Sequence, residues 1–141
     1  MAILFHTIDA DPQLKRKNAL KRWISDCILS EGKKVGDINV IFCSDEHLLE
    51  MNRTHLDHDY YTDIITFDFS MADRVSGDLY ISYDRVIDNA TQNATPLQTE
   101  TYRVIIHGVM HLCGYKDKGK KDALTMRQQE DKCLSKIVKY F

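Results

Sequence analysis

The sequence predicts an α+β fold in which a small mixed β-sheet of about four strands is covered by helices, with a metal site at the end of a central helix. Three observations favour this class. The expected elements follow one another in the order β-α-β-α-β-β-α-α-α. The composition, with 28% charged and 43% hydrophobic residues, is typical of a soluble globular protein. The length is near the modal size of one domain, and no repeat or Pro/Gly-rich linker divides the chain, so we expect a single domain over residues 1–141.

The first expected elements are a strand and an amphipathic helix. Residues 2–8 are apolar and β-prone. Asp11 and Pro12 match an N-cap followed by proline at the first helical position, so a helix is expected directly after them, ending at Gly32. Its apolar face carries Leu20, Trp23, Ile24, Cys27 and Ile28. Its other face is basic and carries Lys15, Arg16, Lys17, Lys21 and Arg22.

The middle of the chain is expected to supply most of the sheet. Ser44 can cap a short helix that runs through Met51, and a polar loop is expected from 52 to 61. β-Branched and aromatic residues cluster in three segments that we expect to be strands, 37–43, 63–69 and 77–83.

The last third is expected to be helical. Thr95 and Pro96 form a strong helix start, a cap and a first-position proline, and the helix begun there would run to His111. Further helices are expected over 84–94 and 121–138. The earlier of these would bury Val86, Ile87 and Ala90.

Charge, cysteines and hydropathy narrow the class of protein. The formal net charge of −2 excludes a generally basic nucleic-acid-binding surface, although it allows a local basic patch. The four scattered cysteines, without a C-x-x-C pair, are typical of reduced thiols in a cytosolic protein. No apolar run approaches about 18 residues, and the N-terminus reaches His6 too soon for a signal peptide. We therefore expect a cytoplasmic protein without a membrane partner.

The stretch from His107 to Asp117 is the most informative about function. In a helix, His107 and His111 share one face with Cβ atoms about 5–6 Å apart, close enough for both imidazoles to bind one metal ion. Gly114 can end that helix in a left-handed turn, which would bring Asp117 back as an oxygen ligand. Two histidines and a carboxylate with an open position are the layout of a catalytic zinc site. The pattern predicts one zinc ion per chain.

The histidine pair also has a simpler interpretation. Histidines at this spacing occur by chance in many helices, and on a partly buried helix they could hydrogen-bond to backbone or to Asp63 and Asp68. Gly108 stands where zinc peptidases of the H-E-x-x-H type carry their glutamate base, so the chain is not an ordinary member of that class. Glycine instead lets another backbone or the substrate approach the helix.

The run from 107 to 117, H-G-V-M-H-L-C-G-Y-K-D, resembles the H-G-x-x-H-L-x-G-Y-D-H signature of the YbeY family. Residues 62–67 (T-D-I-I-T-F) are similar to the family's T-D-V-L-S-F strand, and 77–82 (G-D-L-Y-I-S) to its G-D-I-x-I-S strand. Met51 and Asn52 stand where the family has Leu-Asn. The motifs follow the family's order, so the resemblance covers essentially the whole chain.

The resemblance implies a zinc-dependent endoribonuclease specific for single strands. The expected role is maturation of the 16S rRNA 3′ end and ribosome quality control, with single-stranded rRNA and the small ribosomal subunit as partners and no DNA. The expected catalytic and metal-binding residues are His107, His111 and Asp117. Lys116, Lys118, Lys120 and Lys121 are candidates to hold the RNA backbone, although a solvated turn is the alternative. The basic face of the first helix is a second candidate RNA surface, for which a merely solvated face is the favoured interpretation.

Two positions depart from the family pattern. Asp117 replaces the family's third histidine, and a carboxylate there can still bind zinc but removes one positive charge from the centre. Leu56 replaces an arginine that is thought to assist catalysis or bind phosphate. Arg53 is a candidate to replace it as an RNA-binding residue, and the alternative is a solvated surface charge. Tyr115 can stack on a base or pack in the core, and Cys113 is expected to be a buried apolar filler.

Two other functions stay open. One is a metallohydrolase that acts on another substrate, and the missing glutamate argues against a peptide substrate. The other is a ribosome-assembly or RNA-binding factor whose metal is mainly structural, which both departures make more credible.

Overall fold

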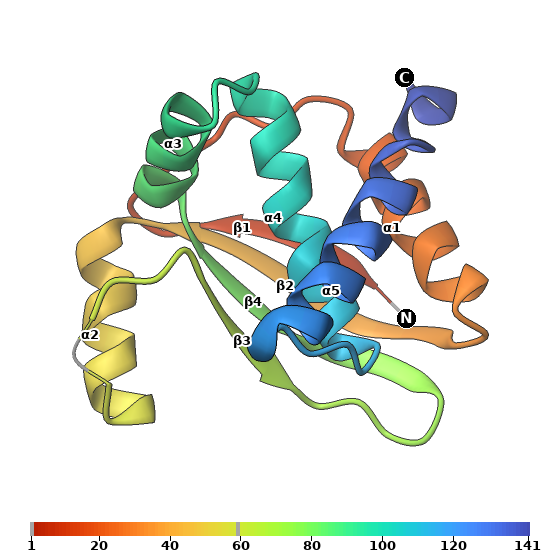
Figure 1. Cartoon of the computed structure of the whole chain (residues 1–141), viewed down its shortest axis with the longest axis horizontal. Coiled ribbons are helices and arrows are strands. Elements are labelled where there is room, and N and C mark those ends of the chain that lie inside the picture. The colour runs from red at the N-terminus through yellow and green to blue at the C-terminus, as the bar shows by residue number, and fades with distance from the viewer. Residues whose placement is uncertain (1, 59) are drawn as a thin grey trace.

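A four-stranded mixed sheet is the scaffold of the molecule (Figure 1). The computed structural model describes residues 2–58 and 60–141. The strands are β1 (Ile3–Thr7), β2 (Lys34–Cys43), β3 (Ile64–Asp68) and β4 (Arg74–Ser82). They lie in the order β1-β2-β4-β3, with β1, β2 and β4 parallel and β3 antiparallel to β4 at one edge. The predicted α+β class is confirmed.

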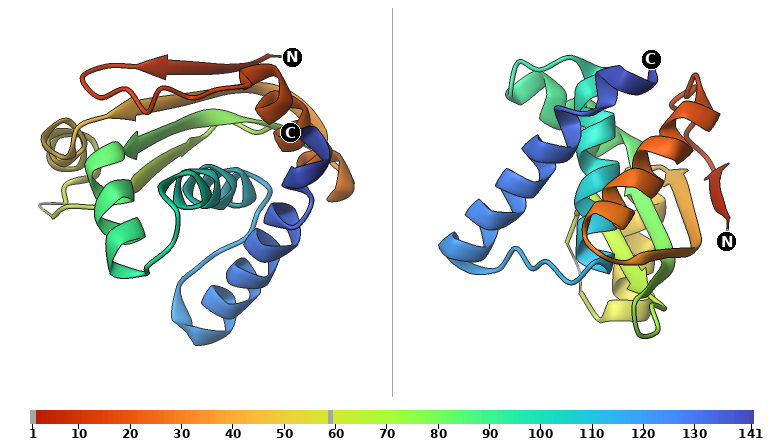
Figure 2. Two further views of the ribbon diagram at one scale, coloured as in Figure 1. Left: turned by 90° about the horizontal axis from the view of Figure 1, so that it is seen from above. Right: turned by 90° about the vertical axis from the view of Figure 1, so that its right-hand side faces the viewer.

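Helices cover this sheet unequally on its two sides. The α-helices of the described residues are α1 (Lys17–Ser30), α2 (Asp45–Leu56), α3 (Tyr83–Gln92), α4 (Leu97–Leu112) and α5 (Gly119–Leu134), followed by the 3-10 helix η1 (Ile137–Tyr140). Seen from above, α4 lies beneath the sheet between α3 and α5 (Figure 2). By contrast, α2 forms a smaller cluster in which Leu48 packs with Cys43 and Ile65. None of these helices is long and apolar enough to cross a membrane.

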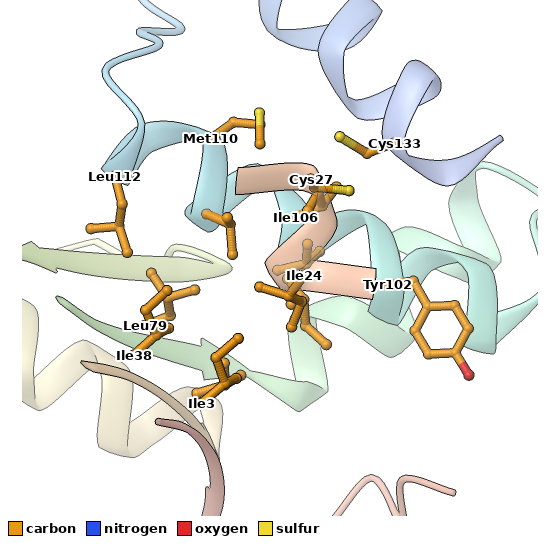
Figure 3. Packing of buried hydrophobic residues seen from close by; sticks show 14 of the residues in the cluster. Ile3, Ile24, Cys27, Ile38, Leu79, Tyr102, Ile106, Met110, Leu112 and Cys133 are labelled. Atoms are coloured by element: carbon orange, nitrogen blue, oxygen red, sulfur yellow. The ribbon is translucent and has the colours of Figure 1, made fainter. Parts of the chain in front are cut away.

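Helix α4 is the centre of the hydrophobic core. Its residues Ile105, Ile106, Val109 and Met110 are fully buried. Figure 3 shows Leu112 on the side of α4 that faces the sheet, near Leu79 of β4, and Met110 on the opposite side, toward Cys133. The indole Nε1 of Trp23 donates to the carbonyl oxygen of Cys133 at 2.8 Å and links α1 to the end of α5. All four cysteines are free and buried.

Two glycines let α4 and the sheet approach each other. A Cβ at Gly108 would lie 2.7 Å from Cδ1 of Ile64 and 3.0 Å from the methyl groups of Leu79. A Cβ at Gly77 would lie 2.4 Å from the carbonyl oxygen of Phe67 and 2.7 Å from Cδ2 of Leu112. Gly108 therefore permits close approach as predicted, but the groups that approach it are sheet side chains and not another backbone or a substrate.

The first helix begins later than the sequence predicts. α1 starts at Lys17, because Gln13 and Arg16 have left-handed φ angles of 52° and 55° that interrupt a helix. The carboxylate of Asp11 accepts a hydrogen bond from the amide of Gln13 at 2.7 Å, so it closes a local turn instead of capping a helix. The predicted start directly after Pro12 was therefore wrong.

The segment after Met51 also differs from the prediction. Ser44 does cap α2, since its Oγ accepts from the amide of His47 at 3.1 Å. The helix then continues to Leu56 and ends at Asp57, which has a left-handed φ of 54°. The expected loop thus begins about one helical turn later, and the side chain of Asn52 is buried within the helix.

Smaller differences occur in the second half. β4 begins at Arg74, three residues earlier than expected, because it continues its pairing with β2. Val86 and Ala90 are buried, whereas Ile87 is 43% exposed and not in the core. Pro96 and not Thr95 occupies the N-cap of α4, and the Thr95 hydroxyl instead contacts the carboxylate of Glu100 at 3.4 Å.

We expect Gly77→Ala to destabilise the fold, because the new methyl group would meet a backbone carbonyl that cannot move without disturbing the β3–β4 pairing. The loss in unfolding free energy should be about 1–3 kcal/mol, measured by urea denaturation. Arg74→Ala, which truncates an exposed side chain of the same strand, should change stability by less than about 0.5 kcal/mol. Equal unfolding midpoints for wild type and Gly77→Ala would contradict this account.

Candidate metal centre

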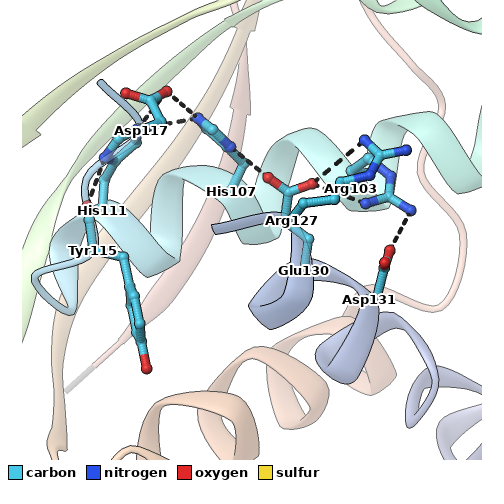
Figure 4. A network of polar contacts seen from close by, with 8 residues as sticks. All are labelled: Arg103, His107, His111, Tyr115, Asp117, Arg127, Glu130 and Asp131. Carbon is cyan, nitrogen blue, oxygen red and sulfur yellow. Dashed lines mark hydrogen bonds and ion pairs between the residues drawn. The ribbon is translucent and has the colours of Figure 1, made fainter. Parts of the chain in front are cut away.

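The end of α4 reverses the chain so that a carboxylate returns to the two histidines. His107 and His111 occupy the last turns of α4 on one face. The helix then ends in a glycine turn in which the amide of Gly114 donates to the carbonyl oxygen of His111, and that of Tyr115 to Met110, each at 3.0 Å. Gly114 has a φ of 107°, which favours glycine. The reversed chain carries Asp117 back over the imidazoles (Figure 4).

Three potential ligand atoms converge at this point. Nε2 of His107 and Nε2 of His111 are 3.0 Å apart. Oδ2 of Asp117 lies 3.2 Å from the first and 3.4 Å from the second. The structure therefore brings together the three residues that the sequence pattern singled out.

The other nitrogen of each ring faces an acceptor. Nδ1 of His107 lies 2.6 Å from Oε2 of Glu130, and Nδ1 of His111 lies 2.9 Å from the carbonyl oxygen of Tyr115. A carbonyl oxygen and a carboxylate can only accept, so each Nδ1 carries a proton, and in the neutral form of each ring Nε2 presents a lone pair. Neither ring bonds to Asp63 or Asp68, which were the acids considered from the sequence.

This arrangement fits a metal ion. Two neutral imidazoles whose Nε2 lone pairs face each other at 3.0 Å beside a carboxylate need a cation between them, which is either a proton or a metal ion. Zinc bonds of about 2.0–2.2 Å in a tetrahedron place ligand atoms about 3.3–3.5 Å apart. The observed separations of 3.0–3.4 Å are close to that spacing.

The surrounding charges favour a cation at the same place. Burial alone would lower the pKa of His107, but the hydrogen bond and charge of Glu130, together with the charges of Asp63 and Asp117, raise it above its ordinary value. Burial acts to raise the pKa of Glu130, yet His107 and Arg103 hold it below its usual range, so Glu130 is ionised. Burial also raises the pKa of Asp63, against the opposing effect of His107.

The ligand atoms open into a groove of about 450 Å³. Its walls are the end of α4, the edge strand β3, and the end of α2 with the segment that follows it. Among the described residues that line it, the acids Asp63, Asp68 and Asp117 are present and no lysine or arginine is. A phosphate group would therefore meet repulsion in this groove unless a cation were bound there.

The predicted RNA-binding residues lie outside the groove wall. Four of them are exposed in the turn before α5 and in its first turn: Lys116, Lys118, Lys120 and Lys121. Arg53 lies on α2, 3.8 Å from the carboxylate of Glu50. Leu56, at the position of the family's arginine, lines the groove and is 40% exposed.

Cys113 is buried in the core, as expected, and the partly buried Tyr115 packs against the core, which is one of the two positions considered for it. The hydroxyl of Tyr115 donates to Glu31 at 2.5 Å, which raises the pKa of Tyr115 to about 12. Cys113 is buried, which raises the pKa of its thiol to about 12.

Sequence reasoning missed the partner of His107. Glu130 was not considered because it lies 23 residues away on another helix. One signal was available, since Glu130 falls at helical spacing between Met126 and Cys133, two buried residues of α5. An acid within an apolar stripe indicates a buried partner.

Comparisons with known proteins identify the family of the chain. A family model described as "Endoribonuclease YbeY" matches residues 6–138. The protein of that name from Phocaeicola vulgatus is 51% identical over 126 residues, covering 89% of this chain and 91% of its own. Its counterpart from Bacteroides thetaiotaomicron is 47% identical over 136 residues, covering 96% and 98%.

A solved structure is similar as well. The solution structure of TM1509 from Thermotoga maritima matches with a TM-score of 0.70 and 27% sequence identity, covering 96% of this chain and 89% of that one. The family model spans nearly the whole sequence, and the two relatives match over 91% and 98% of their own length. The chain therefore belongs to the YbeY family.

Proposed function

We propose that this protein is a metal-dependent endoribonuclease that cleaves single-stranded RNA, with one zinc ion held by His107, His111 and Asp117. The observation that carries the proposal is the convergence of the two Nε2 atoms, 3.0 Å apart, and the Asp117 carboxylate at an open groove. The relatives that share the sequence are named as endoribonucleases, which sets the substrate class.

The residues of the chain provide a rigid and polarised site. A zinc ion bound there would polarise a phosphoryl oxygen or activate a water molecule for attack on the phosphodiester. His107 and His111 are oriented by their Nδ1 hydrogen bonds and need no rearrangement. Gly108 packs against Ile64 and Leu79, so the helix position that carries a base in zinc peptidases faces the sheet and not the groove.

The groove suits an unpaired strand. Tyr60 is 55% exposed, lines the groove, and stacks on His58 with ring centroids 5.2 Å apart. Aromatic faces of this kind bind unstacked bases, which only a single strand offers. The side chain of Asn52 donates to the carbonyl oxygen of Tyr60 at 2.8 Å and so fixes this segment to α2.

We further propose that the substrate is ribosomal RNA on the small subunit, that cleavage serves 16S rRNA 3′-end maturation and ribosome quality control, and that the protein acts in the cytoplasm. The resemblance of the H-G-V-M-H-L-C-G-Y-K-D run and the two strand motifs to the YbeY family supports this assignment.

A second candidate is a ribosome-assembly factor whose metal is mainly structural. One observation favours it: the groove wall carries Leu56 where the family has an arginine, so a cationic group is replaced by an apolar one. Restored rRNA processing in cells that express only a variant that still binds zinc but cleaves no RNA would support this candidate over the nuclease.

The metal centre is tested by metal content. After zinc addition, mass spectrometry should find close to one zinc per wild-type chain, and strongly reduced zinc in Asp117→Ala, which lacks the carboxylate ligand. Asp122→Ala removes an exposed carboxylate five residues away and should bind zinc like the wild type. Wild-type protein that takes up no zinc would refute the proposed centre.

The activity is tested on an RNA strand, alone and paired with its complement. The zinc-loaded wild type should cleave the single strand, a chelator should stop cleavage, and the duplex should resist because its bases are not available for stacking. His111→Ala should lose cleavage, whereas His6→Ala should retain it, because His6 lies on β1 and bonds to Asn39. Cleavage that survives in His111→Ala would assign the activity to a contaminant or to another site.

The lysine cluster is tested by salt dependence of RNA binding. Replacing Lys118, Lys120 and Lys121 by alanine should weaken binding and reduce the slope of log K against log salt by about 2, since each lost phosphate contact on a single strand removes about 0.7. The charge-matched control replaces Lys132, Lys136 and Lys139, which lie at the end of α5 and around η1 and belong to neither candidate RNA surface. An equal loss in the control, or none in the cluster variant, would contradict a specific role for these lysines.

A further inference from the structure

Glu130 is a buried acid behind the metal centre, outside the groove. It is 5% exposed and lies on α5 between Met126 and Cys133, which are buried in the core. Its two carboxylate oxygens have different partners. Oε2 accepts from Nδ1 of His107 at 2.6 Å, and Oε1 accepts from Nη1 of Arg103 at 2.8 Å (Figure 4).

We propose that Glu130 is a positioning residue that fixes the ring orientation and the Nδ1-protonated form of His107, so that Nε2 is held toward the metal. This inference rests on the proposed metal centre. A metal-binding histidine commonly donates its other N–H to a carboxylate, which selects the tautomer and makes the ligand nitrogen more basic. The 2.6 Å contact provides that acceptor for His107.

Arg103 determines which oxygen of Glu130 is available to the histidine. Its guanidinium lies on α4, one helical turn before His107, and bonds to Oε1 of Glu130 with Nη1 and to Oδ1 of Asp131 with Nη2, at 2.8 and 2.9 Å. The fork fixes the carboxylate plane, so Oε2 faces His107. The positive charge of Arg103 also compensates for burial of the Glu130 carboxylate.

The two imidazoles are supported in different ways. His111 donates to a backbone carbonyl that belongs to the turn itself, so no side chain is needed to orient it. His107 depends on a side chain from another helix. A single substitution on α5 can therefore remove the group that orients His107, but not the one that orients His111.

The test compares the zinc affinity of wild type, Glu130→Gln and Asp131→Asn by competition with a coloured chelator. The glutamine amide has one oxygen and cannot accept from both Arg103 and His107, so affinity should fall about 10- to 100-fold. Asp131→Asn is the matched control: it makes the same chemical change at the adjacent residue and to the same arginine, but does not touch His107. Because the side chain of Asp131 is 58% exposed, the zinc affinity of Asp131→Asn should stay within about twofold of the wild-type affinity.

The possible outcomes distinguish a failure of the proposed role of Glu130 from a failure of the proposed metal centre. Wild type that binds no zinc would refute the proposed centre. Wild type and Glu130→Gln that bind zinc equally would refute the role of Glu130 alone, as would an equal loss in Asp131→Asn. If Glu130→Gln does not fold, nitrogen NMR of the zinc-free wild type, at a pH where the imidazole is neutral, decides: a His107 proton on Nδ1 supports the inference, and a proton on Nε2 overturns it.

Discussion

The packing of α4 across β3 and β4 is the constraint on which the candidate site depends. Gly77 and Gly108 carry no Cβ at the contact between helix and sheet. The side chains of Leu79 and Leu112 fill that space instead. One face of α4 is thereby held against the core and the face with the two histidines is turned toward the groove. The same packing puts the edge strand β3 along the groove wall, close to the ligand atoms.

Charge is distributed around the site in two separate layers. Asp117 faces the place of the proposed ion. A divalent ion and this carboxylate together carry a formal charge of about +1. Behind His107, Glu130 is balanced by Arg103 and does not reduce that charge further. This division explains how a chain with an acidic third ligand can retain an electropositive centre for a phosphodiester.

The sequence was informative where the structure is local. The two histidines, the turn at Gly114 and Asp117 lie within eleven residues, so helical spacing and glycine chemistry were enough to predict their convergence. The start of α1 could not be predicted, because left-handed residues at Gln13 and Arg16 outweighed the proline signal. Glu130 could not be paired with His107, and Leu56 could not be placed in the groove, because tertiary packing of α5 and α2 decides both.

Tyr115 joins the ligand turn to a distant helix. Its carbonyl oxygen accepts from His111, and its hydroxyl donates to Glu31 at the end of α1. Helix ends usually fray first, with opening free energies near zero. Here the end of α4 cannot open without also breaking a contact to α1. Opening of the ligand-bearing turn is therefore coupled to the loss of a contact with α1, which holds the turn more firmly than an unanchored helix end.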